Sequence, residues 1–237
     1  MSVFRDKFKG LAAASIDDQT HFFLHRFVFA LGEAGYSEVL ELKGKFVEAL
    51  KHDDGKQSMS GGAAADFLQK LGKTRTAKQR KDEIGDVDAN GDGRCYFIEF
   101  LLLNYKVMIL GDYFKRKGME PDVDLGNDGV GLIGVGDRLV EELYAPVPGL
   151  DPELDNMMKT FALDQATQAS KIAELQVIVD GGGVKAMAAK TSLEKLKTTD
   201  VSSMNALEAR IAAAIKKGSK KADEQMVGLS IPPAAIS

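Results

Sequence analysis

DANGDGRCYFIE, the stretch from Asp88 to Glu99, is the most specific chemical signal in the chain and decides its fold. It matches the twelve-residue calcium loop of an EF-hand, in which oxygen ligands at alternate positions converge on one hard cation. Gly93 stands at position 6, where the loop turns sharply. Glu99 at position 12 can close the coordination sphere with both carboxylate oxygens. The pattern predicts a Ca²⁺ site formed by the side chains of Asp88, Asn90, Asp92 and Glu99, the carbonyl of Arg94 and, through water, Tyr96.

A degenerate partner loop is expected upstream, because EF-hands normally occur in pairs joined by a short backbone ladder. Counting back 36 residues from Asp88 reaches the segment HDDGKQSMSGGA, His52 to Ala63, which stands between two helical stretches. Met59 and Cys95 share position 8 of the two loops, so both should face inward. Three ligand positions lack the required oxygen and hold His52, Lys56 and Ala63. We therefore expect a structural partner that binds no calcium, with a plain helix–loop–helix as the alternative.

Amphipathic helices surround both loops. Apolar residues recur there at three- and four-residue spacing, and glycines separate the segments. Helices are predicted over Asp18–Leu31, Ser37–Lys51, Ala63–Leu71, Thr76–Gly85 and Phe97–Lys117. Residues 1–118 thus form a predicted helical EF-hand domain.

The next segment, residues 119–152, is rich in glycine and proline and is predicted to be an interdomain linker with one short helix, Gly136–Tyr144. Within it, residues 124–135 repeat the loop spacing after another 36 residues, with Asp128 and Gly129 in register. Gly126 and Val135 stand at ligand positions 3 and 12, so this stretch is either a weak remnant of a loop or a coincidence.

Long helical patterns return after the linker. The longest is predicted over Glu153–Asp180, and Gly181–Gly183 should end it before two further helices, Val184–Lys197 and Ser202–Lys217. Residues 153–218 are expected to form a helical domain, and residues 219–237 a flexible tail. The predicted fold class is all-α: an EF-hand pair with one intact and one degenerate loop, followed by a helical hairpin or bundle. A partial coiled coil and packing against neighbouring helices both remain open for the long helix.

Composition excludes several classes of function. A net charge of −4 gives no bulk electrostatic case for nucleic acid or an anionic membrane, and no run of about 18 apolar residues exists to cross a bilayer. With Cys95 as the one cysteine, the chain has no disulfide framework, so we expect a reducing, cytoplasmic setting. His21 and His25 lack a third metal ligand, and no nucleophilic triad or phosphate loop is present, so the chain is not expected to be an enzyme.

Two basic regions stand out in this acidic chain: Lys70–Lys81, just before the calcium loop, and Lys185–Lys221 over the last helices. Solvated helix faces are the usual explanation of such charge. The alternative is two separate contacts with an acidic polymer, an arrangement that would suit a cross-linker.

The sequence resembles the calcium-regulated actin-bundling proteins of amoebae. The likeness is clearest in RKDEIGDVDANGDGRCYFIEFLLLNYK, Arg80 to Lys106, with its charged helix, DVD entry, DGR turn and Leu-Leu and Tyr-Lys pairs. It recurs more faintly in GVKAMAAKTSL, from Gly183, and AAAIKKGSKK, from Ala212. Members couple an EF-hand pair to a helical, partly coiled-coil region, and calcium weakens their bundling of filaments.

This resemblance implies that Asp88, Asn90, Asp92 and Glu99 form a calcium switch, and that the basic C-terminal helices contact filamentous actin. The expected function is calcium-regulated cross-linking of actin filaments in the cytoplasmic cytoskeleton. A calcium-binding structural or adaptor protein of another assembly, flagellar or microtubular, is the alternative. A soluble calcium buffer is a third hypothesis, although a buffer with one intact loop would be inefficient.

Overall fold

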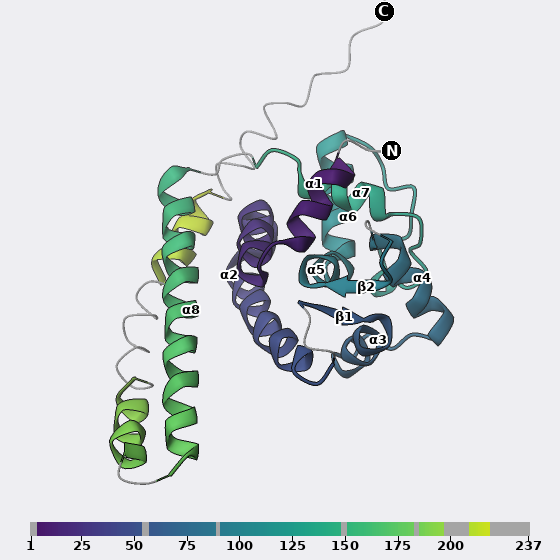
Figure 1. Ribbon diagram of the computed structural model, residues 1–237. Coiled ribbons are helices and arrows are strands. Elements are labelled where there is room, and N and C mark those ends of the chain that lie inside the picture. Colours follow the sequence, from purple (N-terminus) through teal and green to yellow (C-terminus); the bar gives the residue numbers. More distant parts are fainter. Residues whose placement is uncertain are drawn as a thin grey trace, which may run out of the picture. The chain divides into compact units, whose positions relative to one another are not determined.

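The computed structural model describes residues 4–53, 57–88, 91–147, 151–182, 185–196 and 209–218. The chain divides into two compact units, Met1–Val147 and Pro148–Ser237. Both units are helical (Figure 1), as expected of the all-α class. Across the described ranges, no helix is long and apolar enough to cross a membrane.

The first unit contains a ring of helices around one short antiparallel ladder (Figure 1). Its elements, in chain order, are α1 (Phe4–Ala13), α2 (Ile16–Leu50), β1 (Ser58–Ser60), α3 (Gly61–Lys70), α4 (Ala77–Val87), β2 (Arg94–Tyr96), α5 (Phe97–Asn104), α6 (Lys106–Lys117), the 3-10 turn η1 (Asn127–Gly129) and α7 (Gly136–Leu143).

Helix α5 forms the centre of the first unit's core. It is apolar on every side, so almost all of its side chains are buried, and it packs against α2. Phe46 of α2 lies 5.0 Å from Phe97 and 5.7 Å from Phe100, measured between ring centroids. The buried amide of Gln19 accepts a hydrogen bond from the backbone N–H of Ile98 at 2.8 Å, which satisfies a donor in the first turn of α5.

Helix α1 was not predicted, and the two largest differences in helix boundaries concern α2 and the stretch after β2. The stretches expected as Asp18–Leu31 and Ser37–Lys51 run together as α2, because the chain passes Gly32 by a local change to φ 61° and does not end there. The single helix expected over Phe97–Lys117 is instead divided into α5 and α6 at Tyr105. No glycine or proline marks that break.

The larger difference from the sequence prediction concerns residues 119–152, which were expected to form a linker. The first unit extends to Val147, and α7 packs against α1, α2, α4 and α6. The boundary between the units therefore lies inside the expected linker, near its end. The Gly- and Pro-rich composition reflects turns packed on the first unit, including Gly129, Gly131 and Gly134 with positive φ.

The second unit begins with α8 (Pro152–Asp180), as predicted for that segment. Asp151 caps this helix by accepting a hydrogen bond from the N–H of Leu154 at 2.8 Å, and Pro152 occupies its first position. Residues 185–196 and 209–218 are also helical, and each buries one face, through Ala189 and Leu193 and through Ile211 and Ile215. The predicted tail, 219–237, lies outside the described residues, and the coiled coil remains a prediction.

Candidate metal centre

A two-stranded ladder joins the loop of Asp88–Glu99 to the upstream loop. β1 and β2 pair antiparallel in the register Ser58 with Tyr96, Met59 with Cys95 and Ser60 with Arg94. Met59 and Cys95 are each 1% exposed, so the inward position expected of both is confirmed. Burial, and after it the charges of Glu99 and Asp88, raises the pKa of the Cys95 thiol well above its ordinary value.

Asp88 organises the first half of the candidate loop. It is the C-cap of α4, and its carboxylate accepts three backbone hydrogen bonds, from Gly91 at 2.7 Å, Asp92 at 3.3 Å and Gly93 at 2.9 Å. Gly91 and Gly93 adopt φ of 71° and 68°, a conformation that a residue with Cβ adopts only with strain. The loop therefore wraps its N–H groups around one carboxylate.

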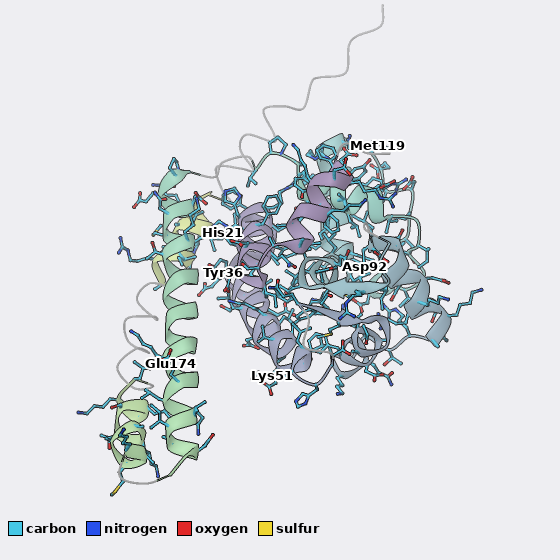
Figure 2. All side chains as sticks on the ribbon, in the orientation of Figure 1. His21, Tyr36, Lys51, Asp92, Met119 and Glu174 are labelled. Atoms are coloured by element: carbon cyan, nitrogen blue, oxygen red, sulfur yellow. The ribbon has the colours of Figure 1, made fainter. Side chains whose placement is uncertain are left out.

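The second half of the loop turns two more carboxylates toward its own backbone. Asp92, labelled in Figure 2, accepts from the N–H of Arg94 at 2.9 Å and from the hydroxyl of Tyr96 at 3.0 Å. Glu99, in the first turn of α5, is 1% exposed and accepts from the N–H of Tyr96 at 2.9 Å. Burial, followed by the hydrogen bond to Asp92, raises the pKa of the Tyr96 phenol.

These residues supply the oxygen donors that a hard divalent cation such as Ca²⁺ requires. Asp88, Asp92, Glu99 and the backbone of Arg94 lie on one loop of twelve residues, whereas Asn90 lies outside the described residues. Within the described part of the chain, no three His, Cys, Asp or Glu side chains are already gathered closely enough to hold a metal ion. The donor types and loop path fit calcium, and binding would require the carboxylates to converge.

The side chains of the upstream loop, residues 52–63, differ from the oxygen donors of the candidate loop. His52 is exposed, Ala63 has no oxygen in its side chain, and Lys56 lies outside the described residues. The Asp53 carboxylate accepts from the N–H of Ser60 at 2.6 Å and from its hydroxyl at 3.1 Å, which closes the loop on itself. Arg94 donates from Nε to the hydroxyl of Ser58 at 2.6 Å and so links the two loops side by side.

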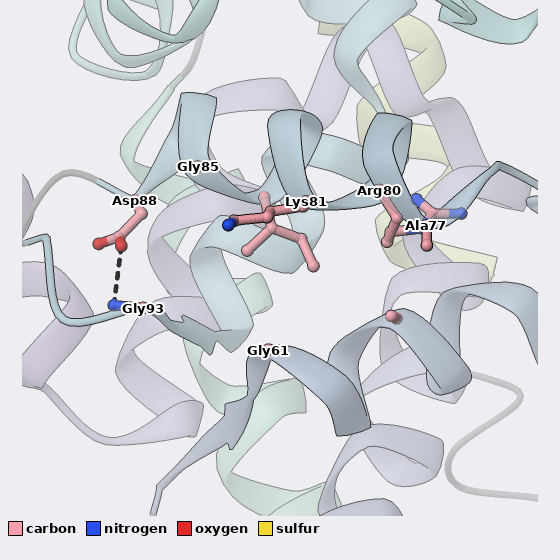
Figure 3. A pocket seen from close by; sticks show the side chains of 9 residues that line it. Gly61, Ala77, Arg80, Lys81, Gly85, Asp88 and Gly93 are labelled. Atoms are coloured by element: carbon pink, nitrogen blue, oxygen red, sulfur yellow. Dashed lines mark hydrogen bonds between the residues drawn. The ribbon is translucent and has the colours of Figure 1, made fainter.

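A groove of about 520 Å³ lies between α3 and α4 and reaches the candidate loop (Figure 3). Small or aliphatic groups line most of it, including Ala65, Ala77 and Ile84. Asp88 and Gly93, joined by their hydrogen bond, close the end near the loop. Any change in the position of Asp88 therefore changes the groove.

Three of the six cations in the basic run Lys70–Lys81 are paired with carboxylates of the protein, which the sequence pattern does not predict. The carboxylate of Glu83, a residue only 2% exposed, receives Arg75 Nε at 3.1 Å, Arg80 Nη1 at 2.9 Å and Lys106 Nζ at 3.0 Å. Lys73 donates to Asp128 at 2.8 Å. The exposed cations of the run are those of Lys70, Lys78 and Lys81.

The same cations reach the loop-like stretch 124–135. Asp128, at φ 51°, binds Lys73 through its carboxylate, and its backbone carbonyl accepts a hydrogen bond from Arg75 Nη2 at 3.1 Å. Lys106 Nζ donates to the carbonyl of Leu132 at 3.2 Å. Gly129 lies so close to Lys106 that an added Cβ would be 2.7 Å from Cε. The Asp128 carboxylate and the Leu132 carbonyl, at positions 5 and 9 of this stretch, thus already bind side-chain cations of the protein.

Helix α7 is attached to α4 just before the candidate loop. One oxygen of the Asp86 carboxylate accepts from the N–H groups of Val135 at 3.0 Å and Gly136 at 3.1 Å. At the other end of α7, Glu142 is 1% exposed, receives Arg116 Nε at 2.7 Å and forms an ion pair with Arg26.

The second basic region, Lys185–Lys221, lies in the second unit. Lys185, Lys190 and Lys195 are exposed on the helix 185–196. On the helix 209–218, the exposed cations are Arg210, Lys216 and Lys217. Lys197, Lys220 and Lys221 lie outside the described residues.

One family model and one solved structure are similar to this chain. A sequence model of the family described as "F actin bundling C terminal" matches residues 107–227, just over half of the chain. A solved structure, the 34 kDa F-actin bundling protein from Dictyostelium discoideum, aligns with a TM-score of 0.47 and 15% sequence identity, covering 95% of this chain and 98% of that one. No curated protein matches the sequence.

Proposed function

Because the chain belongs to the F-actin-bundling C-terminal family, we propose that it cross-links actin filaments under the control of calcium. The family match carries the actin part of the proposal. It spans α6, α7 and the described helices of the second unit, so the proposed filament-binding region includes parts of both units. The proposed role is structural, at the cytoplasmic actin cytoskeleton, and involves no catalysis.

The calcium part of the proposal depends on the loop Asp88–Glu99. We propose that it is the intact member of an EF-hand pair, with residues 52–63 as the degenerate member. The ladder between Met59 and Cys95 and the three backbone hydrogen bonds to Asp88 support this assignment. Bound calcium would supply positive charge that draws Asp88, Asn90, Asp92 and Glu99 together, with the Arg94 carbonyl and a water held by Tyr96.

Exposed cations supply the proposed contacts with filaments, which are acidic polymers. Lys70, Lys78 and Lys81 are exposed on the first unit, and the lysines of the helices 185–196 and 209–218 are exposed on the second. Two contacts on one chain can bridge two filaments, because each contact can hold a different filament. Lys81 also lines the groove beside Asp88, so calcium would alter the first contact directly.

Low-speed cosedimentation with filamentous actin, in chelator and in micromolar free calcium, tests the proposal. We expect the wild-type protein to pellet actin in chelator and to pellet less of it in calcium. Glu99→Gln should pellet actin equally under both conditions, because the amide keeps an acceptor for the Tyr96 N–H but loses the charge needed for bidentate binding.

Glu120→Gln is the matched control, since it removes the same charge from an exposed residue outside the loop. It should retain the calcium response. If Glu99→Gln abolished bundling in chelator, the loop would be part of the filament contact and not its switch. If wild-type protein left actin in the supernatant at low and high speed, a role as an adaptor of another filament system would become the better hypothesis.

A further inference from the structure

Helix α7 has no N-cap side chain of its own. It spans eight residues, Gly136–Leu143, and the residue at its N-cap, Val135, cannot accept a hydrogen bond with its side chain. The first N–H groups of a helix need an acceptor from elsewhere, and a short helix cannot compensate by propagation. The acceptor is the carboxylate of Asp86, which lies on α4, about 50 residues earlier.

The contact between α4 and α7 is also tight along the backbone. A Cβ on Gly136 would lie 1.9 Å from the carbonyl oxygen of Asp86, so only glycine fits against α4 at this point. The negative charge of Asp86 faces the positive end of the α7 macrodipole, which adds to the hydrogen bonds. The first turn of α7 is therefore fixed to the last turn of α4.

Asp86 stands two residues before Asp88, the first position of the candidate calcium loop. In a helix, neighbouring residues at this spacing point to different sides. Asp86 thus faces α7 while Asp88 faces the loop, and both belong to the same end of α4. A displacement of Asp88 by a bound cation would move Asp86 with it.

The far end of α7 is held equally firmly. The Glu142 carboxylate binds Arg116 of α6, and Arg26 of α2 donates to the Glu142 carbonyl at 2.6 Å. Arg26 precedes Phe27, where α2 departs from helical geometry. Helix α7 therefore connects the end of α4 to the kink of α2, and it is the last helix of the first unit.

We propose that Asp86 is a positioning residue that transmits the state of the calcium loop to α7. This inference rests on the proposed calcium binding and extends it to a specific route. Calcium at the loop shifts the end of α4. The trans cap, in which Asp86 of α4 accepts the first N–H groups of α7, carries this shift to α7, the helix that directly precedes the second unit. Coupling of this kind requires a contact that differs between the two states, and the proposal assigns that role to the Asp86 carboxylate.

Hydrogen–deuterium exchange of residues 136–143 in the full chain, with and without calcium, tests the route. Calcium loading is followed separately by isothermal titration with Ca²⁺ alone. In the wild-type protein we expect calcium to change the exchange rate of these amides by about fivefold or more, the lower end of usual coupling factors. Asp86→Ala should bind calcium but lose this change in α7.

Asp82→Ala is the matched control. It removes an exposed carboxylate from the same helix one turn earlier and should retain the response in α7. If Asp86→Ala does not fold, Asp86→Asn, which keeps one acceptor oxygen, should show a reduced response.

A full response in a calcium-loaded Asp86 variant would overturn the proposed route, as would an unresponsive α7 in calcium-loaded wild type. Absence of calcium binding in the titration would instead overturn the proposed calcium function itself, and the route with it.

Discussion

At the scale of single residues, Glu83 holds together three cations, one of which, Lys106, lies 23 residues further along the chain. Its carboxylate binds Arg75 and Arg80, which flank the start of α4, and Lys106, at the start of α6. All four side chains are at least nine-tenths buried. Buried charges of this kind are tolerated only when they are paired, so all three cations lose a paired carboxylate if Glu83 is neutralised.

Glu83→Gln should therefore lower the free energy of unfolding by about 3–5 kcal/mol, the usual cost of breaking a buried ion pair by removing one partner. The neighbouring exposed variant Asp82→Asn should change it by less than about 0.5 kcal/mol. Urea denaturation followed by circular dichroism measures both. Equal stability of the two variants would show that water already satisfies the three cations.

The Glu83 cluster also explains why the sequence could not show which cations of the basic run are buried. Charge runs are usually solvated, and the acids that pair with Arg75 are 8 and 53 residues away, at Glu83 and Asp128. No local pattern connects them. The loop Asp88–Glu99 was different, because its candidate ligands lie within twelve consecutive residues and their spacing could be counted directly.

At the scale of elements, α4 and α7 meet through the backbone of Gly136. Gly136→Ala should destabilise the first unit by about 1–3 kcal/mol, the usual cost of overpacking, because its Cβ would collide with the Asp86 carbonyl. Gly111→Ala, on α6 with open space at its Cβ, should instead stabilise the protein by roughly 0.5–1 kcal/mol. Opposite signs in urea denaturation are the expected result, and a shared sign would contradict the close approach.

Helix existence followed from sequence more reliably than helix boundaries. Periodicity predicted α3, α4 and α8 nearly to the residue, and the spacing between loops predicted the inward pair Met59 and Cys95. Periodicity could not show that α2 continues past Gly32, because a single positive φ can be absorbed without ending the helix. It also missed the role of residues 119–147, since their contacts with α4 come from the fold and not from a local pattern.

At the scale of the whole molecule, the boundary between Val147 and Pro148 separates the candidate calcium loop from the C-terminal basic helices. The family match begins at residue 107 and so crosses this boundary. The first unit carries the candidate calcium loop and the aromatic core, while the second carries the basic region with more exposed cations, six among its described residues against three in Lys70–Lys81.

A fragment of residues 1–147 should therefore fold and bind calcium with an affinity within about twofold of the full chain, since independent sites add to within roughly 0.5 kcal/mol. It should not bundle filaments, because the cations of the second unit are missing. Calorimetry with Ca²⁺ and low-speed cosedimentation measure the two properties. Bundling by the fragment would place both filament contacts in the first unit.

The trans cap of α7 also bears on how the chain acquires its structure during synthesis. Eight residues are too few to hold a helix in water, so α7 cannot nucleate by itself. Its acceptor on α4 leaves the ribosome about 50 residues earlier and can already be in place when Gly136 emerges. The acceptor on α4 is thus synthesised before the helix α7 that needs it. We expect the first unit to be complete before most of the second has been made.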